Sequence, residues 1–204
     1  MTTIFLTILM NTAFLGTTLS GYEVGSKAAD FNLMNITGKT VSLSDFPDAK
    51  GFIVIFTCNH CPYAQAYQDR IISIDQAYKQ KGYPVIAINS NNPVNDPRDS
   101  YENMIVRAKE KGFTFPYLVD VDQKVLVKYG AKYTPTVFLL RKENNGNMIV
   151  KYIGAIDDNY SDADAVRTHY LRDAVDALLT GREPQPNFTK AIGCNIPYND
   201  TAQK

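Results

Sequence analysis

One stretch of this chain restricts its fold more than any other. It begins with Gly-Phe-Ile-Val-Ile-Phe-Thr (51–57), a β-branched and aromatic run that is typical of a buried strand. Cys58 and Cys61 follow directly, and Pro62 comes next. Residues 63–78 carry apolar side chains every three or four positions, which predicts a helix. Pro62 suits the first turn of that helix, because the amide hydrogen that proline lacks is unpaired there anyway.

Two faces are expected for this helix. A helix that covers a sheet buries one apolar stripe and turns its polar side chains to solvent. The inward set is Tyr63, Tyr67, Ile71, Ile74 and Tyr78, and the outward set is Gln68, Asp69, Asp75 and Lys79.

The remaining pattern alternates strands with helices. A hairpin is expected around 37–39, a second buried strand at 84–89, and a helix that Asp99 opens, with Glu102 completing a capping box. Later elements are strands at 115–119, 136–140 and 148–153, a short helix at 125–129 and a last helix from about 164 to 179. This order predicts an α/β fold: a central mixed sheet flanked by helices, with an N-terminal β-hairpin and a central helix-containing insertion.

The length of 204 residues fits one domain with an extension at each end. Residues 1–20 are largely apolar and end in small side chains, which predicts a secretory signal peptide. Because no Lys or Arg precedes Lys27, an N-terminal extension is the alternative. Residues 21–183 are expected to form the domain, and residues 184–204, with three prolines, a tail packed on its surface.

Export follows from the signal peptide, so we expect a periplasmic or secreted protein, with a cytoplasmic one as the alternative. The apolar stretch is too short and too interrupted by polar residues for a membrane span. A stable membrane protein is therefore not expected, unless residues 1–20 are retained as an anchor.

Charge and cysteine content narrow the function. Lys and Arg together number 21, as do Asp and Glu, and no long basic run occurs, so we expect no nucleic-acid partner. Three cysteines are too few for a disulfide scaffold, and two of them are close in the sequence, which favours redox chemistry or metal binding. Neither a second CxxC motif nor a nearby cluster of ligands accompanies the first, so we expect no metal.

Cys58 and Cys61 are the predicted catalytic residues, together with His60 and Pro62. On the first turn of a helix, the i, i+3 spacing lets the two sulfurs pair, and the helix N-terminus stabilises a thiolate. Cys58 would be the exposed attacking thiol, and Cys61, one turn inside, the resolving thiol. We expect no cofactor beyond a redox-active Cys58–Cys61 disulfide.

His60 stands between the two cysteines. A protonated imidazole beside the thiolate favours the reduced pair, which makes the couple more oxidising. The alternative is a solvent-facing His60 with little influence on either sulfur.

Thr134 and Pro135 are the predicted substrate-binding residues. Pro135 comes just before a buried strand, where it cannot take part in the sheet ladder. It is either an ordinary trans turn proline or a cis-proline. A cis-proline would leave the Thr134 backbone exposed for strand-like pairing with a substrate peptide that carries a cysteine.

Several stretches together resemble a known family. They are Phe-Thr-Cys-Asn-His-Cys-Pro-Tyr (56–63), Val-Ile-Ala-Ile-Asn-Ser-Asn (85–91), Glu-Lys-Gly-Phe-Thr-Phe-Pro-Tyr (110–117) and Ala-Ile-Gly-Cys-Asn-Ile (191–196). With Thr134-Pro135 and the strand order, they resemble the thioredoxin superfamily, within it the redoxin-domain group related to alkyl hydroperoxide reductase and thiol-specific antioxidant proteins, and there the peroxiredoxin-like branch. The resemblance covers roughly residues 22–198 and implies a thioredoxin-like fold and redox activity.

Two departures bear on the chemistry that this resemblance implies. Thioredoxin usually has Trp before its first cysteine, where this chain has Thr57 and no Trp at all. Peroxiredoxins carry Pro-x-x-x-Thr-x-x-Cys, and alignment of their peroxidatic cysteine on Cys61 puts Cys58 at the Thr and Val54 at the Pro. Their activating Arg is replaced by the Thr134-Pro135 element. These differences favour dithiol–disulfide exchange.

Three alternative functions therefore remain. The first is a thiol–disulfide oxidoreductase that exchanges a disulfide with substrate proteins or small thiols and with an upstream electron donor or acceptor. The second is a thiol-dependent peroxidase that uses Cys61 or Cys58. The third is a copper-binding chaperone of thioredoxin fold, which would need a distant histidine; His169 is the only other one in the chain.

Cys194 is left over in the tail. It could be a third redox thiol that reaches the CxxC pair, a linker between molecules, or a packed small apolar residue. We prefer the packed residue.

Overall fold

The computed structural model describes residues 21–199. Ten strands are found there: β1 (Lys27–Ala28), β2 (Leu33–Asn35), β3 (Thr40–Val41), β4 (Gly51–Phe56), β5 (Val85–Asn89), β6 (Tyr117–Val119), β7 (Tyr133–Thr134), β8 (Thr136–Lys142), β9 (Met148–Gly154) and β10 (Cys194–Asn195). Eight of them form one sheet in the order β1–β9–β8–β4–β5–β6–β2–β3, and β10 pairs with β7 in a separate two-stranded sheet. Strands β4, β5 and β6 run parallel, whereas β8 and β9 are antiparallel to their neighbours, so the main sheet is mixed as expected.

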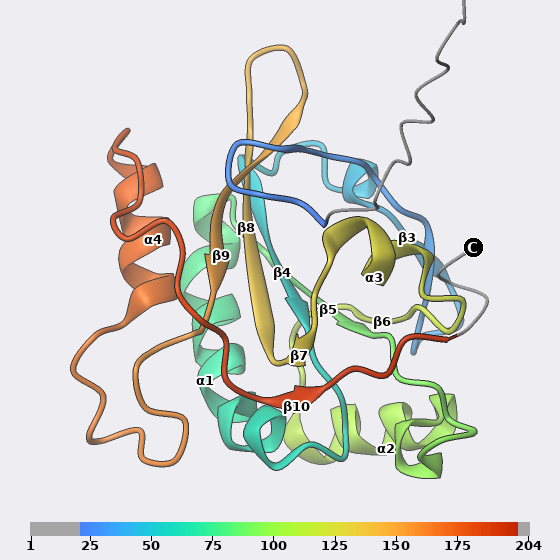
Figure 1. Ribbon diagram of the computed structural model, residues 1–204. Helices are drawn as coiled ribbons and strands as arrows, with labels where there is room; N and C mark the ends of the chain where they lie inside the picture. Colours follow the sequence, from blue (N-terminus) through green and yellow to red (C-terminus); the bar gives the residue numbers. More distant parts are fainter. Residues whose placement is uncertain (1–20, 200–204) are drawn as a thin grey trace, which may run out of the picture.

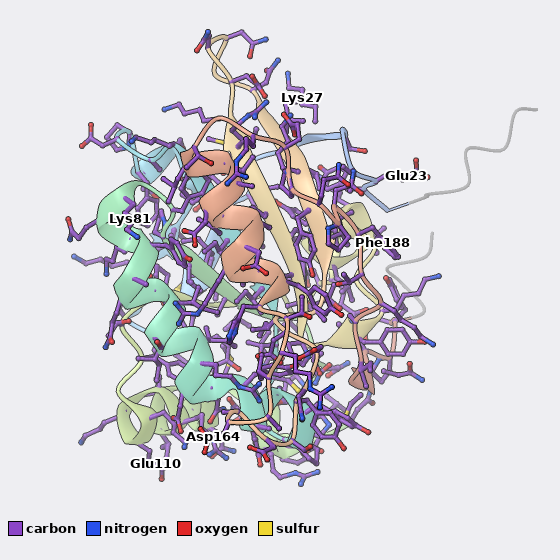
Figure 2. All side chains as sticks on the ribbon, turned by 90° about the vertical axis from the view of Figure 1, so that its left-hand side faces the viewer. Glu23, Lys27, Lys81, Glu110, Asp164 and Phe188 are labelled. Carbon is purple, nitrogen blue, oxygen red and sulfur yellow. The ribbon has the colours of Figure 1, made fainter. Side chains whose placement is uncertain are left out.

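Four α-helices accompany the sheet: α1 (Pro62–Tyr78), α2 (Tyr101–Lys111), α3 (Lys124–Tyr129) and α4 (Tyr170–Leu179). Helices α1 and α4 cover one face, and α3 covers the other together with the N-terminal segment (Figure 1). Turned by a quarter, the molecule presents α1 and α4 side by side in front of the sheet (Figure 2). Both faces of the central strands are therefore covered.

Strand β4 shows how this cover follows from the sequence. Ile53 and Ile55 belong to the apolar cluster beneath α1 and α4, whereas Phe52, Val54 and Phe56 belong to the cluster on the α3 face. All six residues of β4 are buried, because successive side chains alternate between two covered faces. The unbroken apolar run that ends at Phe56 therefore forms a rigid central strand. Both cysteines follow directly after its end.

Most predicted elements are confirmed, with shifted ends. The N-terminal hairpin is β2 and β3, and the second hairpin is β8 and β9. The last helix is shorter than predicted: it begins at Tyr170, not near residue 164, and His169 is its N-cap. In the preceding stretch, polar side chains bond to nearby backbone groups, as when Asp158 accepts from the N–H groups of Arg167 and Thr168, and this competes with helix formation.

The predicted outward face of α1 is wrong at two positions. Gln68 and Asp75 are buried, with exposed fractions of 3% and 1%. The Asp75 carboxylate accepts hydrogen bonds from the Val85 N–H at 3.1 Å and from the Thr114 hydroxyl at 2.7 Å. The buried Asp75 carboxylate is tolerated because its hydrogen-bond partners lie inside the protein. The bond to the Val85 N–H also holds the start of β5 against α1.

Part of the tail lies on the domain surface, as β10 shows where it crosses the lower part of the molecule beside β7 (Figure 1). The signal peptide predicted for residues 1–20 lies outside the described residues, as do residues 200–204. Among residues 21–199, no helix has the length and apolar character that a bilayer crossing requires.

The buried carboxylate of α1 gives a stability prediction. Asp75→Ala leaves the Val85 N–H without its acceptor, so the free energy of unfolding should fall by about 1–3 kcal/mol in urea denaturation. Asp69→Ala, on the exposed side of the same helix, is the matched control and should change it by less than about 0.5 kcal/mol. Equal losses in the two variants would contradict the assignment.

Candidate active site

Cys58 and Cys61 lie between the end of β4 and the start of α1, but not on the first helical turn. Cys61 is the N-cap, with extended backbone angles (φ −68°, ψ 122°), and Pro62 is the first helical residue. The reason is local: proline disfavours helical angles in the residue before it, so the helix cannot include Cys61. The N-terminus of α1, with its unpaired N–H groups, therefore lies next to Cys61.

Both sulfurs are covered. Cys58 is 1% exposed and Cys61 is not exposed at all, so the prediction of an exposed Cys58 is wrong. Thr134 contacts both cysteines: its hydroxyl lies 3.2 Å from the Cys58 sulfur, and its carbonyl oxygen lies 3.3 Å from the Cys61 sulfur. Thr134, which the sequence predicts to bind substrate, lies in contact with the redox pair in this structure.

The two thiols differ in acidity. A hydrogen bond from Cys58 lowers the pKa of Cys61 to about 4; burial opposes this shift, and hydrogen bonds from the Cys194 thiol and the Ala64 N–H support it. The same bond to Cys61 raises the pKa of Cys58, as do burial and the negative charge of Asp99. These directions favour the first thiolate at Cys61, whereas the sequence predicts Cys58 as the attacking thiol.

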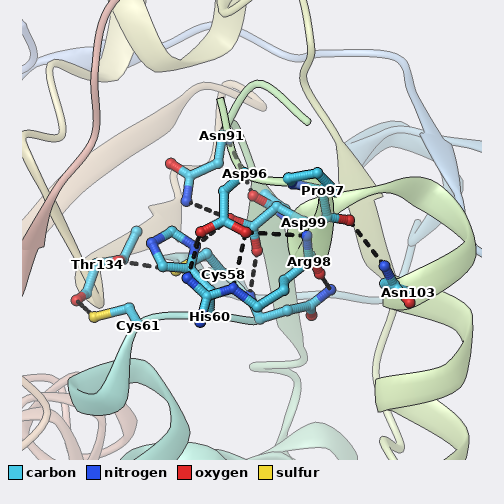
Figure 3. A network of polar contacts seen from close by, with 12 residues as sticks. Cys58, His60, Cys61, Asn91, Asp96, Pro97, Arg98, Asp99, Asn103 and Thr134 are labelled. Atoms are coloured by element: carbon cyan, nitrogen blue, oxygen red, sulfur yellow. Dashed lines mark hydrogen bonds and ion pairs between the residues drawn. The ribbon is translucent and has the colours of Figure 1, made fainter. Parts of the chain in front are cut away.

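His60 faces an acidic pair (Figure 3). Its Nδ1 lies 2.5 Å from an Asp99 carboxylate oxygen and 3.7 Å from one of Asp96. Hydrogen bonds from Arg98 lower the pKa of Asp96 to about 2, which keeps that carboxylate ionised. The positive charge of a protonated His60 is thus offset by carboxylates, and the predicted electrostatic effect on the thiolate is weakened.

Asp99 is the site residue that sequence reasoning missed. Its side chain is fully buried and accepts from the Asn59 N–H at 2.7 Å and from the Asn91 amide at 2.8 Å (Figure 3). We had placed it at the start of α2, but the N-cap of α2 is Ser100, whose hydroxyl accepts from the Asn103 N–H. The only signal in the sequence is an acidic residue in an Asn- and Pro-rich loop after a buried strand.

Cys58, His60 and Asp99 also form a set of three metal-ligand types. One potential ligand atom of each lies within 4.8 Å of the other two. Sulfur, imidazole nitrogen and carboxylate oxygen are all zinc ligands, although the His60–Asp99 hydrogen bond already accounts for part of this closeness. The copper hypothesis relied on His169, which lines a different cavity, with Arg70 and Asp157 and without any cysteine.

The Thr134–Pro135 peptide bond is cis. The predicted exposure of the Thr134 backbone is wrong, however, because Thr134 is 2% exposed and its strand edge pairs with β10. Cys194 is the residue opposite Thr134 in this pairing. It packs against the cluster of Cys58, Cys61 and Ala64 while remaining partly exposed.

Several known proteins resemble this chain. Residues 24–152 match the model of the AhpC/TSA family. The thiol-disulfide oxidoreductase ResA of Geobacillus kaustophilus is 32% identical over 130 residues, which span 62% of this chain and 68% of that protein. ResA of Geobacillus thermodenitrificans is 31% identical over the same shares of the two chains.

Solved structures extend the likeness over more of the chain. An uncharacterized conserved protein from Geobacillus kaustophilus has a TM-score of 0.80 at 34% identity, over 87% of this chain and 93% of its own. A hypothetical protein from Sinorhizobium meliloti has a TM-score of 0.80 at 33% identity, over 89% and 97%. The thioredoxin domain of a Bacteroides vulgatus thiol-disulfide oxidoreductase, at 20% identity and a TM-score of 0.52 over 64% of this chain and 88% of its own, shares the fold. The thioredoxin-like fold is thereby confirmed, and the chain belongs to the AhpC/TSA family.

Proposed function

We propose that this protein is a thiol–disulfide oxidoreductase whose Cys58–Cys61 pair alternates between dithiol and disulfide. The likeness to ResA proteins supports the activity. The observation that carries the assignment to these residues is geometric: Cys58 and Cys61 pack in one buried cluster, and Thr134 contacts both of their sulfurs. Two cysteines held together in this way stand where a disulfide between them can form.

The chemistry needs only these sulfurs. The Cys61 thiolate attacks one sulfur of a substrate disulfide and forms a mixed disulfide, and one substrate thiolate leaves. The Cys58 thiol then loses its proton and attacks the Cys61 sulfur; the Cys58–Cys61 bond forms, and the second substrate thiolate departs. The pair gives up two electrons and the Cys58 proton and the substrate disulfide takes up the two electrons, so the exchange balances without a further cofactor.

Several residues position the pair. Thr134 holds both sulfurs, and Pro62 sets the start of α1 beside Cys61. Asp99 faces Cys58 and His60, and its charge disfavours a second thiolate at Cys58. This leaves Cys58 as the proton donor of the pair and Cys61 as its nucleophile.

Thiol or disulfide substrates and a redox partner follow from this activity. As the finer assignment we propose substrate proteins or small thiols, with an upstream donor or acceptor that resets the pair. We also propose a periplasmic or secreted location, which the apolar stretch at residues 1–20 supports.

A peroxidase is the second candidate, and one observation favours it. Cys61, which aligns with the peroxidatic cysteine of peroxiredoxins, carries the lowered pKa. Peroxide reduction would require Cys61 alone for the attack, so it should survive Cys58→Ser. Disulfide exchange requires both cysteines, and the two variants therefore separate the candidates.

The exchange activity gives the first test. Cys58→Ser and Cys61→Ser should each slow reduction of a protein disulfide by on the order of 100-fold or more, because each variant leaves one sulfur of the pair. Asp69→Ala, far from the sulfurs on the exposed side of α1, should retain wild-type turnover. Thiol-dependent peroxide consumption that persists in Cys58→Ser and disappears in Cys61→Ser would favour the peroxidase instead.

The pKa order gives a second test. Ultraviolet absorbance should show one thiolate at pH 7 that is protonated as the pH falls through about 4, since the folded pKa of Cys61 lies below its ordinary value. Cys61→Ser should abolish this step. Cys58→Ala should move it to higher pH, and Cys58→Ser, which keeps a hydroxyl donor, should move it less. A thiolate that survives Cys61→Ser and vanishes in Cys58→Ser would reverse the assignment.

A further inference from the structure

The tail holds a cysteine against the redox pair through backbone pairing. Cys194 lies opposite Thr134 in the β10–β7 ladder, and the Ile196 N–H donates to the Lys132 carbonyl at 2.9 Å. The preceding residue, Gly193, approaches Thr134 so closely that a Cβ atom there would lie 2.0 Å from the Thr134 carbonyl oxygen. Only glycine fits this position, so the tail sequence is suited to this docked strand.

The docked strand occupies the edge that a substrate would need. An extended peptide that pairs with an exposed strand edge gains its main-chain hydrogen bonds there. At Thr134 those bonds are already made by residues of the same chain, and the residue that faces the redox pair is a cysteine. The tail thus presents a thiol where a substrate thiol would lie.

Cys194 contacts one member of the pair in particular. Its thiol hydrogen-bonds the Cys61 sulfur, and that bond helps to lower the pKa of Cys61. Burial, followed by the same bond, raises the pKa of Cys194 to about 12, which makes it a donor to the Cys61 thiolate. Cys61 therefore has a thiol partner in each of the other two cysteines, and all three pack together.

Exposure distinguishes the third thiol from the other two. Cys58 and Cys61 are buried, whereas Cys194 is partly exposed. Of the three, Cys194 is therefore the residue in partial contact with solvent.

We propose that Cys194 is a resident third redox thiol, which exchanges with the Cys58–Cys61 disulfide at the Cys61 sulfur and carries the disulfide to the surface. The inference rests on the proposed function and assigns the tail strand as its internal substrate. External thiols and disulfides then react at Cys194.

The exchange step balances within the chain. Cys194 loses its proton and attacks the Cys61 sulfur of the Cys58–Cys61 disulfide. The Cys61–Cys194 bond forms, the Cys58–Cys61 bond breaks, and Cys58 leaves as a thiolate that takes up the proton. One disulfide is present before and after the step, so no oxidant or reductant is consumed. An external thiol can then attack Cys194, with Cys61 as the leaving thiolate.

Disulfide mapping of cysteine variants tests the relay. Cys58→Ser is incubated with oxidised glutathione, quenched in acid, alkylated, digested and analysed by mass spectrometry. We expect the internal Cys61–Cys194 disulfide to exceed the glutathione adduct of Cys61 by about tenfold, because the tail holds the two sulfurs together at high effective concentration. Cys61→Ser is the matched control and should give no such excess of a Cys58–Cys194 bond. A Cys194 that stays free, beside a glutathionylated Cys61, would overturn the relay.

Two tail variants connect the disulfide to strand docking. Gly193→Ala places a methyl group against the Thr134 carbonyl and should lower the internal Cys61–Cys194 yield by about tenfold in the Cys58→Ser background. Ile192→Ala, which removes an exposed side chain of the same tail, should leave that yield unchanged. Equal yields in all three proteins would show that strand docking does not bring the sulfurs together.

Wild-type protein supplies a second measurement that does not depend on a folded variant, and it separates the two proposals. Mild oxidation should give both the Cys58–Cys61 and the Cys61–Cys194 disulfide in monomeric protein. If the Cys58–Cys61 disulfide alone forms and Cys194 is fully alkylated, the relay is overturned and the proposed function stays intact. Absence of the Cys58–Cys61 disulfide and of protein-disulfide reduction would overturn the proposed function itself.

Discussion

The active site depends on where α1 begins, and Pro62 decides that. Because the residue before a proline is pushed out of the helical region, Cys61 becomes the N-cap and the CxxC segment stays in the turn before the helix. An N–H group of the first turn, that of Ala64, then hydrogen-bonds the Cys61 sulfur. A motif with the same cysteine spacing but no proline could extend the helix back to the first cysteine and favour that sulfur instead.

Burial alone would raise the pKa of both cysteines, so specific contacts must decide which sulfur carries the charge. Four groups lower the pKa of Cys61 by hydrogen bonding: the Cys58 thiol, the Cys194 thiol, the Ala64 N–H and the Thr134 side chain. Cys58 has the Asp99 carboxylate nearby, and a second anion there would be repelled. At Cys61, hydrogen bonds lower the pKa by more than burial raises it. At Cys58, the hydrogen bond to Cys61, burial and the negative charge of Asp99 all raise the pKa. The pair consequently holds one thiolate, and the site as a whole avoids two adjacent buried anions.

Much of this architecture could be predicted from local patterns, since buried strands and amphipathic helices leave periodic signals. Strand β4, Pro62 at the start of α1, and the β8–β9 hairpin were all predicted in this way. The errors concern polar groups whose partners are distant in the sequence. Asp75 looks like a solvent-facing residue until Val85 and Thr114 are known to lie beside it. Asp99 likewise resembles a helix cap, because nothing local reveals that Asn59 and His60 will reach it.

Cys194 is a further residue whose partner, Thr134, is distant in the sequence. Its position also determines how the tail affects substrate access. A two-residue strand makes few hydrogen bonds, so docking contributes little free energy of its own. Tethering nevertheless gives the strand an effective concentration in the millimolar range, which a free peptide must exceed to pair with Thr134. Competition of this kind disfavours extended peptides far more than small thiols, because a small thiol needs no strand edge and Cys194 is a partly exposed residue. The tail can therefore select among substrates by geometry, without any change in the chemistry of the buried pair.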